Sequence, residues 1–98
     1  MNGFDPQAMQ EKYEHWCELH QQLIEAQEKF VESIQLMKEL QVYYQSEQWR
    51  HDNQNRPSLK CAKGVYSILS EDGLWNSLSE HQEQAIRWMK LGLEVIDR

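Results

Sequence analysis

An apolar residue recurs at every seventh position through the first half of this 98-residue chain. No glycine or proline lies between Pro6 and Pro57. The six residues of the repeat are Met9, Trp16, Leu23, Phe30, Met37 and Tyr44. A seven-residue apolar repeat keeps one stripe facing a partner only when the helix supercoils. The spacing therefore predicts one long helix with coiled-coil character and favours an all-α fold.

Both ends of this helix can be estimated from the sequence. Asp5 can accept hydrogen bonds from free backbone N–H groups, and Pro6 suits the first helical position because its nitrogen has no proton to lose. The apolar pattern continues to Trp49, so we expect a helix over about residues 6–49, roughly 65 Å long. A break near Ser33–Leu36, where the apolar stripe begins to turn, is the alternative.

The rest of the chain predicts an irregular crossover and a second helix. Residues 50–69 form a polar, Asn-rich segment, with Pro57 inside it and a tight bend at Lys63-Gly64. The hydroxyl of Ser70 can cap a helix over about residues 71–96. We expect this helix to pack antiparallel against the first one, in a single domain over residues 1–98.

The second predicted helix is apolar on two sides. Its inner stripe begins at Leu74 and Leu78 and ends at Ile96. At roughly 40 Å it cannot cover the whole first helix, and an outer stripe faces elsewhere, formed by Trp88, Leu91 and Val95. A helix with two apolar sides needs more than one neighbour. We therefore expect a homodimer, or another protein, to complete the fold.

Charge and composition exclude several classes of protein. A formal net charge of −6 argues against a general nucleic-acid or anionic-membrane binder, because both need a positive field. No segment has the apolar length of a membrane span. Two cysteines, Cys17 and Cys61, without a signal-peptide pattern, predict a reduced, cytoplasmic setting, although a disulfide between them stays open.

Two motifs near the middle of the chain resemble a known family. The first begins at Leu40 and contains Tyr43-Tyr44, Ser46, Trp49 and Asp52; the second runs from Gly64-Val65 to Leu69-Ser70-Glu71-Asp72. Together they are similar to short bacterial proteins catalogued as a domain of unknown function. The chain departs from that pattern by three additional residues, Tyr66 to Ile68, and by Asn53-Gln54-Asn55 in place of acidic residues. The resemblance implies a fold and a bacterial origin, but no chemistry.

The first motif is also the densest polar and aromatic cluster in the chain. Its tyrosines and tryptophan could form a patch for a ligand or a partner, because such side chains combine large contact area with a polar tip. Alternatively, Tyr44 and Trp49 close the core at the helix end, while Asp52 caps Ser70–Asp72 or pairs with Lys63. The sequence favours the structural interpretation.

The sequence predicts no catalytic, cofactor-binding or metal-binding residue. Cys17 and His20 share a helix face, but tetrahedral zinc needs four nitrogen or sulfur ligands at repeated spacings. No nucleophile motif surrounds either cysteine, and the four glycines are scattered rather than gathered in a phosphate loop. We therefore expect a protein that is not an enzyme.

The acidic face of the first helix indicates protein binding. It carries Glu11, Glu14, Glu18, Glu25, Glu28 and Glu32. We expect a protein-binding module, such as an immunity or antitoxin-type inhibitor that docks a basic toxin by charge. The alternative is a small-molecule or, less expected, a nucleic-acid binder that uses Tyr43, Tyr44 and Trp49 with the basic segment from Arg50. The partner-binding candidates are Tyr43, Tyr44, Ser46, Trp49, Asp52, Arg56, Lys60, Lys63, Trp88, Leu91 and Val95.

Overall fold

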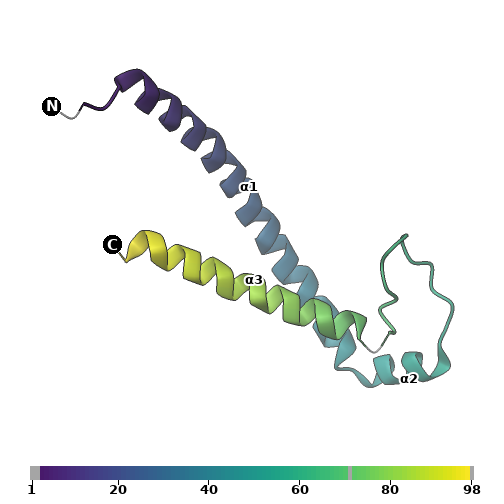
Figure 1. Cartoon of the computed structure of the whole chain (residues 1–98). Helices are drawn as coiled ribbons and strands as arrows, with labels where there is room; N and C mark the ends of the chain where they lie inside the picture. The colour runs from purple at the N-terminus through teal and green to yellow at the C-terminus, as the bar shows by residue number, and fades with distance from the viewer. Residues whose placement is uncertain (1–2, 71, 98) are drawn as a thin grey trace. The chain divides into compact units, whose positions relative to one another are not determined.

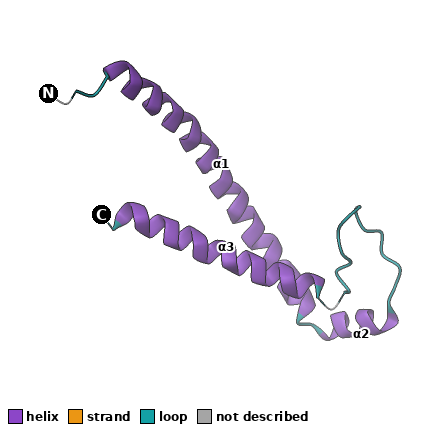
Figure 2. Cartoon of the chain, viewed as in Figure 1, coloured by secondary structure: helices purple, strands orange, loops and turns teal. Residues whose placement is uncertain are grey.

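The computed structural model describes residues 3–70 and 72–97. It contains three helices: α1 (Pro6–Tyr44), α2 (Glu47–Asn55) and α3 (Gly73–Ile96) (Figure 1). No strand occurs in the described residues (Figure 2), so the all-α prediction is confirmed. Contacts divide the chain into two compact units, Met1–Leu36 and Met37–Arg98, and α1 runs from the first unit into the second.

The predicted start of α1 is confirmed. The Asp5 carboxylate accepts a hydrogen bond from the Gln7 backbone N–H at 3.2 Å. The Asp5 carbonyl accepts one from the Met9 N–H at 3.0 Å. The Gln7 contact pairs one of the N–H groups that every helix start leaves free, the Met9 contact is the first regular bond of the helix, and Pro6 has no N–H to leave unpaired. The helix then runs for 39 residues and does not break at Ser33–Leu36.

The predicted end of the first helix was wrong, because α1 ends at Tyr44 rather than near Trp49. Ser46 has an extended backbone (φ −84°, ψ 158°) and is the N-cap of α2. Its hydroxyl donates to the Tyr43 carbonyl at 2.6 Å and accepts from the Trp49 N–H at 3.2 Å. A single serine therefore ends one helix and begins the next.

The predicted crossover began too early, because residues 50–55 are helical. The last turn of α2 closes at Arg56, which adopts the left-handed conformation (φ 46°) and donates its N–H to the Asp52 carbonyl at 2.8 Å. Pro57 follows, and its ring disfavours a helical backbone at the residue before it. Helix α2 therefore stops at this Arg-Pro step, and an irregular segment leads to α3.

The entry into α3 lies slightly later than predicted, and the N-cap is Asp72, whose side chain forms no capping hydrogen bond. Gly73, rather than residue 71, is the first helical residue; Glu71 lies outside the described residues. The Ser70 hydroxyl accepts a hydrogen bond from the Gly73 N–H at 3.2 Å, as expected of a capping side chain. The far end of α3, Ile96, agrees with the sequence prediction.

The core is small and lies at the start of α3. Among the described residues, only Leu69 (8% exposed) and Leu74 (6% exposed) are buried hydrophobic residues. Leu78 is half-buried, but Ile96 at the end of the predicted inner stripe is 80% exposed. The inner stripe is thus buried only where α3 begins, and completion of the fold by a homodimer stays a prediction.

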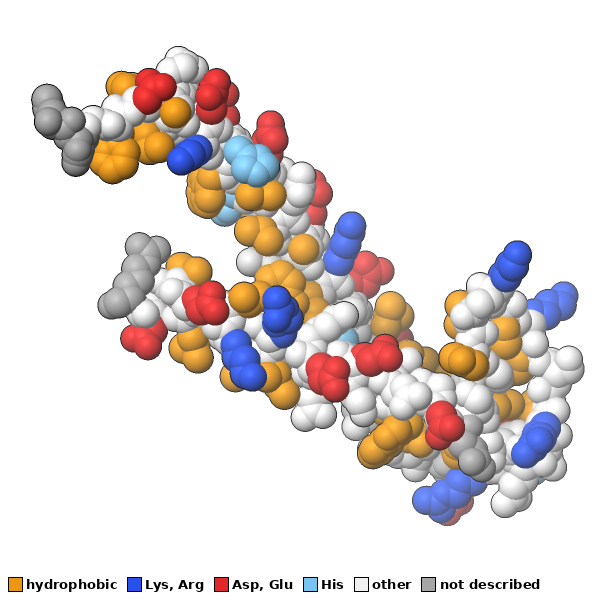
Figure 3. Space-filling model, in the orientation of Figure 1, with side chains coloured by type: hydrophobic (Ala, Val, Ile, Leu, Met, Phe, Trp, Pro, Cys, Tyr) orange, Lys and Arg blue, Asp and Glu red, His pale blue; other side chains and the backbone are white. Residues whose placement is uncertain are grey.

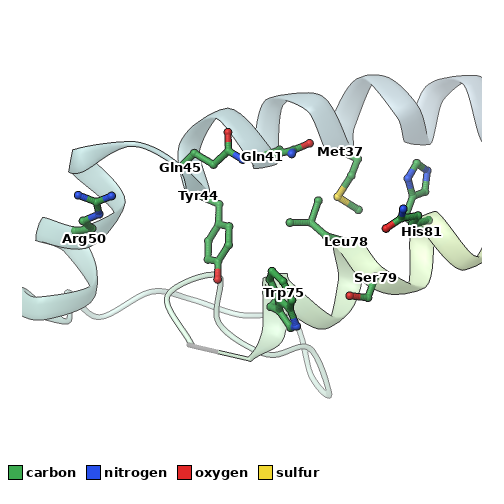
Figure 4. Close-up of a pocket in the computed structure, with 10 residues that line it drawn as sticks. Met37, Gln41, Tyr44, Gln45, Arg50, Trp75, Leu78, Ser79 and His81 are labelled. Atoms are coloured by element: carbon green, nitrogen blue, oxygen red, sulfur yellow. The ribbon is translucent and has the colours of Figure 1, made fainter.

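The last turns of α1 and the first turns of α3 run in opposite directions within the second unit (Figure 4). Leu40 from α1 and Leu74 and Ser77 from α3 line one small cavity there. This arrangement matches the antiparallel pairing expected from the sequence for the part of α1 that belongs to the second unit. Across the described residues, neither α1 nor α3 combines the length and apolar character needed to span a bilayer.

Candidate functional site

The first sequence motif forms a corner between α1 and α2. The Tyr43 hydroxyl donates to the Asp52 carboxylate at 2.6 Å, so Asp52 binds Tyr43 rather than Lys63 or the start of α3. This hydrogen bond, together with desolvation and the charge of Asp52, raises the pKa of Tyr43 above its ordinary value of 10.0. The bond joins the last turn of α1 to the middle of α2.

Two aromatic rings close the same corner. Tyr44 and Trp49 meet edge to face, with ring centroids 4.8 Å apart and planes inclined by 74°, a favourable arrangement for aromatic pairs. The indole Nε1–H of Trp49 donates to the Ile68 carbonyl at 3.0 Å. Trp49 therefore contacts Tyr44 through its ring and binds the segment between α2 and α3 through its indole N–H.

A second side chain of α2 also holds the returning crossover. The Asn53 amide donates to the Leu69 carbonyl at 2.6 Å. The Leu69 N–H donates to the Ser67 hydroxyl at 3.1 Å. Asn53 thus fixes the backbone of one of the two buried residues from a position that the sequence assigned to a loop.

These contacts show what the predicted aromatic cluster does inside the fold. Its residues are all half-buried, and the polar groups of Tyr43, Ser46 and Trp49 are each engaged in the hydrogen bonds described above. The cluster positions the crossover and the start of α3. The structural interpretation of the motif therefore has the stronger support.

The other partner-binding candidates lie outside this corner. Arg56, Lys60 and Lys63 are exposed on the segment after α2, and none has an ion pair with any residue in 3–70 or 72–97. On α3, the stripe residues Trp88, Leu91 and Val95 are 37%, 43% and 61% exposed. Arg56 adjoins the corner, because its backbone N–H donates to the Asp52 carbonyl and it lines a small cavity with Asn53 and Leu69. The contacts of the corner described above do not include Lys60, Lys63 or the α3 stripe.

A groove in the second unit was missed by sequence reasoning. Its volume is about 730 Å³, within the usual range of ligand sites. Its walls include Met37, Gln41, Tyr44, Arg50, Trp75 and Leu78. Figure 4 shows Arg50 of α2 at one end of this group and Met37 with His81 at the other. Two of the heptad residues, Met37 and Tyr44, were the available signal, because both must face a neighbour.

The first unit presents a different surface. Hydrophobic side chains are exposed along α1 (Figure 3), including Trp16 (53%), Leu23 (49%) and Val31 (67%). The Trp16 ring stacks on His20, with centroids 4.8 Å apart and planes inclined by 10°. Seven acidic and two basic residues lie between Met1 and Leu36, a net charge of −5 out of −6 for the chain.

The described residues offer no cluster of three or more histidine, cysteine, aspartate or glutamate side chains that could hold a metal ion. Cys17 and Cys61 are both exposed free thiols, so the disulfide that the sequence left open is not formed.

The chain was compared with protein families, curated proteins and solved structures. No curated protein and no solved structure matches it. The model of one family, "Domain of unknown function (DUF4298)", matches residues 7–91, a range that includes the whole α1–α2 corner and most of α3. The chain therefore belongs to the DUF4298 family, as the resemblance of its two motifs predicted.

Proposed function

We propose that this protein is a non-enzymatic protein-binding module and that its first unit is the docking surface. One observation carries the proposal: the apolar side of α1 is exposed along the first unit. Trp16, Leu23 and Val31 are each about half or more exposed, and α1 is the only helix in the described part of this unit. Fully burying an exposed side chain of this size contributes about 1.5–3 kcal/mol, so a partner that covers these half-exposed ones gains on the order of 1 kcal/mol for each.

Charge supports a basic partner. The first unit has a net charge of −5, whereas the second has eight basic and nine acidic residues. An acidic helix attracts a positive surface and accelerates encounter with it. A basic toxin or nuclease, held by an immunity or antitoxin-type inhibitor, fits these properties.

The setting that we propose is the cytoplasm. Exposed free thiols at Cys17 and Cys61 suit a reducing compartment, where disulfides rarely persist.

Affinity purification from the native host at physiological salt tests the proposal. The wild-type chain should retain one stoichiometric basic protein. Gln21→Glu, which adds a charge on the side of α1 opposite its exposed apolar residues, should retain the same protein. Leu23→Glu adds the same charge on the apolar side of α1. It should lose that protein, because burying an unpaired carboxylate in the interface lowers the binding free energy. Equal retention by Leu23→Glu, or no retained protein at all, would contradict the proposal.

The alternative of a small-molecule or nucleic-acid binder centred on the aromatic corner has less support. The Tyr43 hydroxyl already donates to Asp52 and the Trp49 indole N–H to the Ile68 carbonyl. A ligand that uses these groups would have to break both hydrogen bonds. Added nucleotides or oligonucleotides should therefore leave the tryptophan fluorescence unchanged. A saturable change that Trp49→Phe abolishes would favour the alternative.

A further inference from the structure

Among the described residues that line the groove of the second unit, the one permanent charge is positive. Arg50 is exposed and lines the groove. Its guanidinium forms no hydrogen bond or ion pair with any residue that the structure describes. Among the residues that the structure describes, no aspartate or glutamate lines the groove, although acids exceed bases by six in the chain. An unpaired guanidinium presents a planar fork of donors that matches a carboxylate.

Apolar surface lies beside this charge. Trp75 lines the groove and is 60% exposed. Tryptophan side chains are on average highly buried, so this degree of exposure is unusual. Met37, Tyr44 and Leu78 are half-buried in the same walls. Figure 4 shows Leu78 and Tyr44 pointing into the space between α1 and α3, with Trp75 beside them. This surface can accept an apolar side chain.

Amide groups complete the walls. Gln41 lies in the last turn of α1, Gln45 follows directly after that helix, and Gln82 lies on α3. All three are exposed, and each amide has both donors and an acceptor, which are the groups that a peptide backbone needs. A groove with open sides and amides on both walls suits an extended chain that passes through it.

We propose that this groove binds an acidic peptide segment of another protein. A glutamate or aspartate carboxylate of the peptide lies on Arg50, a neighbouring apolar side chain lies against Trp75, and the peptide backbone hydrogen-bonds to the glutamines. This site belongs to the second unit and is independent of the docking proposed for α1. Loss of binding at one of the two surfaces would therefore leave binding at the other unchanged.

Fluorescence anisotropy with two labelled peptides tests this site on the full chain. The probes are Glu-Leu-Phe-Glu-Leu and Gln-Leu-Phe-Gln-Leu, both amidated at the C-terminus, so that they differ only in their side-chain carboxylates. The acidic peptide should bind at least about fivefold more tightly, because a charge-assisted hydrogen bond is stronger than a neutral one. Equal binding of the two peptides, or no binding of either, would overturn the proposal without requiring any variant to fold.

Two pairs of variants locate the binding. Arg50→Gln should weaken the acidic peptide about fivefold and leave the neutral one unchanged, whereas Lys60→Gln removes the same charge outside the groove and should change neither. Trp75→Ala should weaken both peptides, whereas Tyr66→Ala, at a residue 81% exposed outside this groove, should not. Equal effects within either pair would overturn the proposal. Displacement of the peptide by phenylpropionate at the same concentration would also overturn it, because a small aromatic carboxylate would then bind as well as a peptide.

Discussion

Ser46 serves two helices with one hydroxyl group, donating to the Tyr43 carbonyl and accepting from the Trp49 N–H. Ser46→Ala should lower the free energy of unfolding by about 1–2 kcal/mol, as the loss of an N-cap side chain does. Thermal unfolding followed by circular dichroism measures the change. Ser58→Ala, in the exposed segment after α2, is the control and should shift the midpoint little; a similar shift in both would refute the role of Ser46.

Tyr43 links stability to alkaline pH. The hydrogen bond to Asp52 raises its pKa above 10.0, so the folded state holds the phenolic proton more tightly than the unfolded state does. Its contribution is therefore complete below pH 10 and is lost as the pH rises through the higher folded pKa. Unfolding midpoints in urea should fall more steeply for the wild type than for Tyr43→Phe as the pH rises above 10.0, the ordinary pKa of tyrosine. Parallel pH profiles would contradict this assignment.

Two glycines in α3 should respond oppositely to alanine. A Cβ atom at Gly73 would lie 2.5 Å from the Ser70 hydroxyl oxygen, which accepts from the Gly73 N–H, so Gly73→Ala should destabilise the fold. A Cβ at Gly92 meets nothing within 4 Å, and Gly92→Ala should stabilise by up to about 1 kcal/mol through helix propensity. Melting temperatures of the two variants test this; a rise for both would show that Ser70 moves aside without cost.

At the scale of the elements, α2 fastens the crossover through Trp49 and Asn53, which donate to the carbonyls of Ile68 and Leu69. Trp49→Phe keeps an aromatic ring against Tyr44 but removes the donor to Ile68. Trypsin should then cut after Lys60 and Lys63 several-fold faster than in the wild type, because the segment opens more often. Cleavage after Lys12, in the first unit, is the internal reference, and an unchanged ratio of the two rates would argue against this role.

The same elements show how far sequence reasoning extends. The seven-residue repeat predicted α1, and Asp5-Pro6 predicted its start, because both depend on local chemistry. The end of α1 was missed because Ser46 is a capping residue inside a pattern whose apolar period continues to Trp49. Helix α2 was missed because its Asn-rich end looks like a loop, while Asn53 gains its partner sixteen residues away. The groove was missed because its walls come from three separate segments.

At the scale of the whole molecule, the two units differ in how their helices are held. Leu69 and Leu74, the two buried residues in the described part of the chain, belong to the second unit, and so do the long-range hydrogen bonds of the corner. A helix without tertiary packing is only marginally stable in water. Dilute protein should therefore exchange its backbone amides much faster over residues 6–36 than around Leu69–Leu78, measured by hydrogen exchange with mass spectrometry. Equal protection would mean that a second copy already covers α1.

The part of α1 in the first unit has a further consequence for evolution and engineering. Removing or adding seven residues there changes the length of the rod by about 10 Å and returns every later side chain to nearly the same angle around its axis. The corner built by Tyr43, Ser46 and Trp49 lies in the other unit and is not touched by such a change. The length of α1 in the first unit can therefore change in steps of seven residues while its apolar side keeps its direction.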